Sequence, residues 1–183
     1  MSSPPVARLW HEAQENTPEA ESRGSKNRAL PSSIFSGVTG LSLTAGMVCA
    51  RLADVPGASS VLLGGITAYQ DQIKSQLLGV SPALLQMQSA VDPEVAAQLA
   101  EGVRAKFAFA MQVSSDEVIG LSTTGVAGPD PVGHHQPGEV YIGLSSRAGT
   151  KVFAEQFVGG RAEIREASLE RVLAILREEI GNF

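Results

Sequence analysis

The sequence has one cysteine, Cys49, among its 183 residues. A single cysteine cannot form an intramolecular disulfide or build a thiolate-rich metal site. A chain without disulfides is typical of reducing compartments, so we expect a cytoplasmic protein. His134 and His135 are adjacent and His11 lies far away, and none has a partner at metal-ligand spacing. We therefore predict no metal site.

The chain also lacks an excess of positive charge. Its formal net charge is -5 and its pI is about 5.2. A nucleic-acid surface needs clustered basic residues, so nucleic acid is not expected as the main ligand. A small anionic ligand is still compatible, because it needs only a local cluster of donors.

Long apolar segments are missing as well. The run from Ala29 to Ala50 has no charged residue, which is about the length of a membrane-spanning helix. It contains Pro31, four serines, two threonines and three glycines, and is too polar to span a membrane. The N-terminus has no apolar core typical of a signal peptide. We expect neither a membrane segment nor a secretory leader.

The composition that remains is that of a globular domain, with 43% hydrophobic residues. Residues 1–32 differ from the rest and are predicted to be a tail or linker, with a possible short helix at 6–15. Residues 33–183 are predicted to be the packed domain. Helix and strand signals alternate there, which predicts a single α/β domain, a three-layer α/β/α sandwich with a mixed sheet. The expected strands are 34–40, 60–69, 117–123, 139–146 and 151–158, and the expected helices are 43–53, 70–78, 92–110 and 161–180.

Ser42 is the first candidate for chemistry, in Gly40-Leu41-Ser42-Leu43-Thr44-Ala45-Gly46. It lies where a predicted strand ends and a predicted helix begins. Backbone N–H groups at such a place can hold an anion or an oxyanion, and a serine there can be a nucleophile. The alternative is that Ser42 or Thr44 only caps the helix.

Tyr69 and Lys74 are the second candidates, in GGITAYQDQIK. A serine nucleophile needs a base, and a lysine can serve, with a tyrosine relaying the proton. The alternative is a half-buried tyrosine and a solvated lysine.

The third candidate is the loop that follows the strand at 117–123, which begins Thr123-Thr124-Gly125-Val126-Ala127-Gly128-Pro129. Its small residues allow a ligand to approach the backbone, as in phosphate-binding loops. It is neither a Walker motif nor a dinucleotide fingerprint. The alternative is a plain glycine-rich turn.

Three segments, in order, resemble one family: SLTAGMVCARLADVPGASS (42–60), GGITAYQDQIKSQLLGV (64–80) and TTGVAGPDPVGHHQPGEVYIG (123–143). They are similar to the CinA C-terminal domain family, the nicotinamide mononucleotide deamidases. These enzymes hydrolyse the carboxamide of nicotinamide mononucleotide to nicotinate mononucleotide and ammonia. The resemblance implies a hydrolase of linear amide bonds in pyridine-nucleotide salvage.

The resemblance also implies roles for individual residues. Ser42 is expected to be the nucleophile that forms an acyl-enzyme, with Tyr69 and Lys74 as the activating pair. The expected oxyanion donors and nucleotide-binding residues are Thr44, Ala45, Gly46, Thr124, Gly125, Gly128 and Pro129. A homo-oligomer with no required metal or other cofactor is expected, and a nucleotide is the expected substrate.

Leu41 departs from the family pattern, which has an acidic residue before the serine. A leucine cannot make the polar contacts of a carboxylate. A second hypothesis is therefore a nucleotide-binding or regulatory domain that has lost catalysis. A third is an oligomeric structural partner that uses the N-terminal tail as a contact arm.

Overall fold

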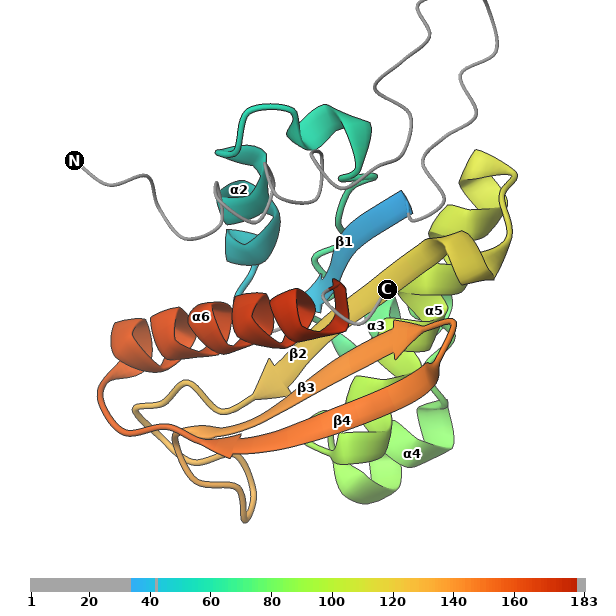
Figure 1. Ribbon diagram of the computed structural model, residues 1–183. Helices are drawn as coiled ribbons and strands as arrows, with labels where there is room; N and C mark the ends of the chain where they lie inside the picture. Colours follow the sequence, from blue (N-terminus) through green and yellow to red (C-terminus); the bar gives the residue numbers. More distant parts are fainter. Residues whose placement is uncertain (1–33, 42, 181–183) are drawn as a thin grey trace, which may run out of the picture.

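The computed structural model describes residues 34–41 and 43–180 (Figure 1). One sheet has the strand order β1-β2-β3-β4, in which β1 and β2 are parallel and the other neighbours are antiparallel. The strands are β1 (Ile34–Leu41), β2 (Val118–Gly125), β3 (Glu139–Ser146) and β4 (Gly149–Gln156). The helices are α2 (Met47–Ala53), α3 (Asp71–Leu78), α4 (Pro82–Gln88), α5 (Pro93–Met111) and α6 (Arg161–Ile180), with short 3-10 turns η1 (Ala58–Ser60) and η2 (Ser115–Glu117). The predicted tail at 1–32, with its helix at 6–15, lies outside the described residues.

Two hydrophobic clusters cover the two faces of the sheet. One joins α2 and α6 to strands β2 and β3, and the other joins α3, α4 and α5. Figure 1 shows α2 and α6 on one side of the sheet and α3, α4 and α5 on the other. This arrangement confirms the predicted three-layer α/β/α domain with a mixed sheet.

The two long helices follow their sequence signals closely. The Asp92 side chain accepts hydrogen bonds from the backbone N–H groups of Glu94 and Val95, and Pro93 is the first residue of α5. The last helix spans 161–180 as predicted. Its buried apolar residues are Ile164, Leu169, Val172, Leu173, Ile175 and Leu176.

The strand predicted at 60–69 is wrong. The structure has no strand there, and Ala68 is the only residue between 61 and 69 that is fully buried. Val61 and Leu62 pack against the α2–α6 cluster, whereas Ile66 packs against the α3–α5 cluster. Ile66 makes an isolated β-bridge, but the segment forms no strand, and its apolar residues contact the clusters on both sides of the sheet.

Smaller differences concern the ends of elements. The hairpin turns at Arg147 and Ala148 alone, so β4 begins at Gly149 and ends at Gln156 rather than spanning 151–158. Helix α4 is not among the predicted helices, although Ser81 caps it and Pro82 begins it. None of the helices that the structure describes is both long enough and apolar enough to cross a bilayer.

Candidate functional site

The carboxyl ends of β1 and β2 meet at the predicted site. Leu41, the last residue of β1, pairs with Thr123 of β2. Ser42, the predicted nucleophile, lies outside the described residues. Beyond it, Thr44 is fully buried, and its Oγ1 lies 3.2 Å from Oγ1 of Thr123. The chain that leaves β1 is therefore tied to the end of β2.

Residues 43–46 form a turn before α2 rather than the first turn of a helix starting at 43. Ala45 and Gly46 have φ of 46° and 97°, in the left-handed region, so α2 begins only at Met47. An alanine in this conformation costs about 1 kcal/mol. Arg165 of α6 holds the turn by donating from Nε to the carbonyl of Leu43 (3.0 Å) and from Nη2 to that of Thr44 (3.2 Å). Gly46 is the N-cap of α2, and the Thr44 hydroxyl pairs with Thr123 instead of capping the helix.

Lys74 is buried, with 1% of its surface exposed. Its Nζ donates to the carbonyl oxygen of Tyr69 at 2.9 Å and to Oδ1 of Asp71 at 2.8 Å. The alternative of a solvated lysine is therefore wrong. The Tyr69 side chain is 54% exposed, and its contact with Lys74 runs through the backbone carbonyl rather than the hydroxyl.

The segment that leads to Tyr69 lies beside the start of α2. The Sγ of Cys49 donates to the carbonyl of Gly64 at 3.6 Å. A Cβ placed on Gly46 would lie 3.9 Å from Oγ1 of Thr67. The structure thus brings residues 64–67 next to Gly46 and the start of α2.

The glycine-rich loop after β2 leaves little room for side chains. A Cβ on Gly125, which has φ of 157°, would lie 2.4 Å from the carbonyl oxygen of Glu139. The Thr124 hydroxyl donates to the carbonyl of Ala90, in the connection between α4 and α5. The Gly128–Pro129 peptide bond is cis, and the carbonyl of Gly128 faces α6.

Arg161, the first residue of α6, contacts both the glycine-rich loop and Tyr69. It is absent from the predicted site. Its Nη1 donates to the carbonyl of Gly128 at 3.1 Å, and its Nη2 donates to the hydroxyl of Tyr69 at 3.2 Å. Arg161 and Arg165 are one turn apart on the same helix face. Basic residues are unfavourable at a helix N-terminus, because the helix dipole is positive there. Two arginines near the start of a predicted helix are therefore a sequence signal that could have pointed to Arg161 and Arg165 as site residues.

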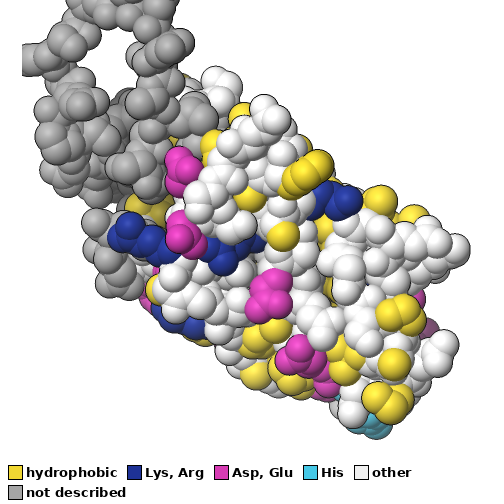
Figure 2. All heavy atoms as spheres, turned by 90° about the vertical axis from the view of Figure 1, so that its right-hand side faces the viewer, with side chains coloured by type: hydrophobic (Ala, Val, Ile, Leu, Met, Phe, Trp, Pro, Cys, Tyr) yellow, Lys and Arg dark blue, Asp and Glu magenta, His cyan; other side chains and the backbone are white. Residues whose placement is uncertain are grey.

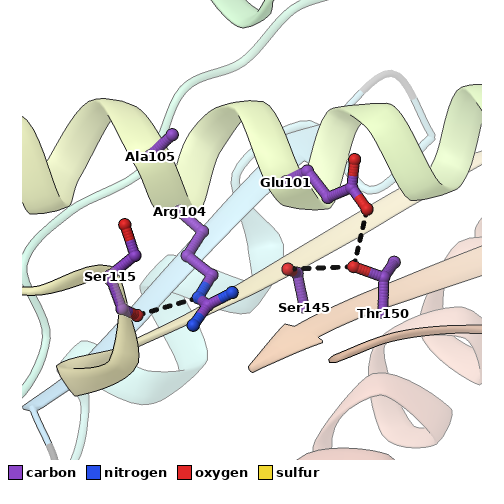
Figure 3. A pocket seen from close by; sticks show the side chains of 6 residues that line it. All are labelled: Glu101, Arg104, Ala105, Ser115, Ser145 and Thr150. Carbon is purple, nitrogen blue, oxygen red and sulfur yellow. Dashed lines mark hydrogen bonds between the residues drawn. The ribbon is translucent and has the colours of Figure 1, made fainter. Parts of the chain in front are cut away.

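A polar hollow of about 180 Å³ lies at the other end of the sheet (Figure 3). Arg104 donates from Nε to the carbonyl of Ser115, and Oγ1 of Thr150 lies 2.7 Å from Glu101 and 3.1 Å from Ser145. The polar side chains that line this hollow are thus paired with groups of the protein itself. Figure 2 shows the face on the right-hand side of Figure 1, where hydrophobic side chains are scattered among polar and charged ones.

Within the described residues, no group of three His, Cys, Asp or Glu side chains could hold a metal ion. The site is instead built from backbone turns, a buried lysine and two arginines. Open α/β domains bind ligands at the carboxyl ends of parallel strands, and this domain gathers its candidate groups there. The fold therefore defines a three-layer α/β/α domain, with its candidate turn at the carboxyl ends of the two parallel strands.

The comparisons with known proteins identify the family. The model of the CinA C-terminal domain matches residues 38–180, so the chain belongs to this family. A Bacillus pumilus protein named as competence-damage inducible is 43% identical over 141 residues, which cover 75% of this chain and 32% of that protein. A CinA-like protein of Solibacter usitatus is 39% identical over 140 residues, covering 76% and 32%. The chain thus spans about a third of the length of these relatives.

Solved structures support the same fold. A competence or damage-inducible protein from Enterobacter asburiae has a TM-score of 0.75 at 19% identity, covering 96% of each chain. The competence/damage inducible protein CihA from Agrobacterium tumefaciens has a TM-score of 0.72 at 24% identity, covering 96% of this chain and 97% of that one.

Proposed function

We propose that this domain hydrolyses the carboxamide of nicotinamide mononucleotide to nicotinate mononucleotide and ammonia. The observation that carries the proposal is the burial of Lys74 beside Tyr69, on a segment adjacent to the turn that follows Ser42. A buried amine near a serine is the arrangement that serine–lysine hydrolases use.

The proposed reaction has two steps. In the first, Oγ of Ser42 attacks the carboxamide carbon, its proton passes toward Lys74, and the C–N bond breaks to release ammonia. In the second, water attacks the ester carbon, and nicotinate mononucleotide leaves as Ser42 recovers its proton. Lys74 accepts a proton in each attack and returns it to the leaving group, as general acid–base catalysis requires.

The remaining predicted residues have places in this scheme. The backbone N–H groups of Thr44, Ala45 and Gly46 are proposed to stabilise the oxyanion. The loop with Thr124, Gly125, Gly128 and Pro129 is proposed to hold part of the nucleotide by its backbone. Arg161 and Arg165 supply positive charge next to both segments, which suits an anionic ligand.

The family membership supports two wider expectations. We expect a homo-oligomer, and we expect the reaction to take place in the cytoplasm, where pyridine nucleotides are recycled. Neither a metal nor another cofactor enters the proposed steps.

Release of ammonia from nicotinamide mononucleotide by the purified protein tests this function. We expect release with the parent protein and a fall of about a thousandfold or more with Ser42→Ala, because the acyl-enzyme cannot form. Ser36→Ala is a matched control that removes a hydroxyl from β1. Equal rates for the parent and Ser42→Ala would contradict the proposal.

Leu41 favours a second candidate, a nucleotide-binding or regulatory domain without catalysis. It is the last residue of β1, directly before Ser42, where the family has an acidic side chain. The same assay separates the two functions when it is paired with calorimetry. Binding of nicotinamide mononucleotide with no ammonia release would support the second candidate.

A further inference from the structure

His135 carries a buried nitrogen without a hydrogen-bond partner. Its side chain is 9% exposed, and Nε2 is the one buried side-chain polar atom in the described part of the chain that has no partner there. Buried polar atoms are nearly always paired, so each exception needs an explanation, such as a ligand or a bound water.

The other side of the His135 ring is fixed. Its Nδ1 lies 2.8 Å from Oε1 of Glu139, and the Tyr141 hydroxyl donates to the same oxygen at 3.0 Å. Burial acts to raise the pKa of the Glu139 carboxyl, but the hydrogen bonds from His135 and Tyr141 outweigh it and hold that pKa below its usual value. With Glu139 as the acceptor for Nδ1–H, the Nε2 atom carries a free lone pair in the Nδ1–H tautomer of the ring.

His135 lies in the returning half of the glycine-rich loop that is proposed to hold the nucleotide, and its partners Glu139 and Tyr141 follow in β3. The N–H of Val126 donates to the carbonyl of Glu139 at 2.9 Å, and the N–H of Gly138 donates to the carbonyl of Val126 at 2.8 Å. A Cβ on Gly128 would lie 3.1 Å from Cβ of Pro137. The returning half of the loop, with His135, therefore runs beside the half that contains Gly125 and Gly128.

The charges around this cluster are negative. Burial raises the pKa of Tyr141, and the carboxylates of Glu139 and then Asp92 raise it further, which places Asp92 within electrostatic reach. The Glu139 carboxylate beside the ring disfavours a phosphate here, whereas the arginines that contact Gly128 and Thr44 lie on α6. Carboxylates and a neutral imidazole nitrogen accept hydrogen bonds, so a group that donates is the fitting ligand.

We propose that Nε2 of His135 accepts a hydrogen bond from a ribose hydroxyl of the bound nucleotide, with Glu139 and Tyr141 holding the ring in position. This inference rests on the proposed function, because it takes a ribonucleotide as the ligand. It makes His135 a binding residue that selects for the sugar hydroxyl, separate from the groups that cleave the amide.

Calorimetry with nicotinate mononucleotide and its 2′-deoxy and 3′-deoxy counterparts tests the inference, since the product binds without turnover. We expect His135→Phe to weaken binding of nicotinate mononucleotide about tenfold. It should leave unchanged the binding of the deoxy ligand that lacks the contacted hydroxyl. His135→Gln, which keeps an acceptor at the end of its side chain, should recover part of the loss. His134→Phe is the matched control: it keeps an aromatic ring against the His135 ring, whose centroid lies 3.9 Å away, and should bind like the parent.

Three results would overturn the inference: no loss in His135→Phe, an equal loss for all three ligands, or a parent protein that binds none of them. An equal loss would assign His135 only to folding of the loop, and no loss would leave Nε2 to a water molecule. The proposed function is judged separately by ammonia release. If His135→Phe shows the hydroxyl-dependent loss of binding but the parent protein releases no ammonia, the inference is retained and the proposed function is rejected. If the parent protein releases ammonia and His135→Phe does so with an unchanged KM, the proposed function is retained and the inference about His135 is rejected.

Discussion

Replacing Lys74 with methionine is expected to reduce ammonia release from nicotinamide mononucleotide by about a thousandfold, because the substitution removes the proposed base. Methionine is one atom shorter than lysine, is unbranched, and keeps most of the buried volume filled. It also removes the contact of Nζ to Asp71, whose side chain is 56% exposed and can be solvated. A substitution that keeps most of the buried volume usually costs little stability. The loss should therefore be seen in kcat while the thermal midpoint stays close to that of the parent.

Lys106→Met is the matched control for this experiment. Lys106 is exposed on α5, so its substitution should change neither rate nor stability. Turnover by Lys74→Met at the parent rate would remove Lys74 from the mechanism. A folded but inactive Lys74→Met protein that still binds the nucleotide would assign Lys74 to catalysis rather than to binding.

Replacing Gly102 with alanine is expected to destabilise the domain by about 3 kcal/mol, the upper part of the range for overpacking. A Cβ at Gly102 of α5 would lie 1.8 Å from the carbonyl oxygen of Leu78, which is backbone and cannot rotate away. Leu78 is the last residue of α3, the helix that carries Lys74. The added methyl must push α3 away from α5, so activity should fall together with stability.

Urea unfolding measures this effect, and Gly133→Ala provides the comparison. Gly133 also has a positive φ of 59°, but a Cβ there would meet nothing within 4 Å. Gly133→Ala should therefore show only the backbone cost of about 1 kcal/mol. Equal unfolding midpoints for the two variants would show that α3 and α5 do not pack as closely as the structure has them.

The fold was predictable where local signals and burial agree. Asp92 and Pro93 indicate the start of α5, and the apolar stripe of 161–180 indicates α6. Both could be predicted because capping and periodicity are local properties of the sequence. The strand predicted at 60–69 is wrong because an apolar run has the same sequence pattern whether it forms a strand or packs against two layers as an irregular segment. The late start of α2 depends on left-handed conformations at Ala45 and Gly46, and an alanine gives no hint of one.

The site was predictable in part. The site around Ser42, Tyr69, Lys74 and the loop after β2 stays a prediction from the sequence. Of these residues, Lys74 contacts the backbone of Tyr69, and Arg161 joins Tyr69 to Gly128. The burial of Lys74 was not predicted, because it depends on α3 packing against α5. Arg161 contacts residues 33 and 92 positions away, so no local pattern could show its bonds to Gly128 and Tyr69. The pairing of His135 with Glu139 has helix-like spacing but lies in a loop, which hides it from periodicity.

Mass spectrometry of protein quenched within milliseconds of mixing with nicotinamide mononucleotide tests the central claim most directly. If Ser42 forms an acyl-enzyme, the peptide that contains it should carry the mass of the nicotinate mononucleotide acyl group. That adduct should be absent from Ser42→Ala and should disappear as ammonia release is completed. Ammonia release at the parent rate with no adduct at any time, or an adduct that persists in Ser42→Ala, would contradict the account.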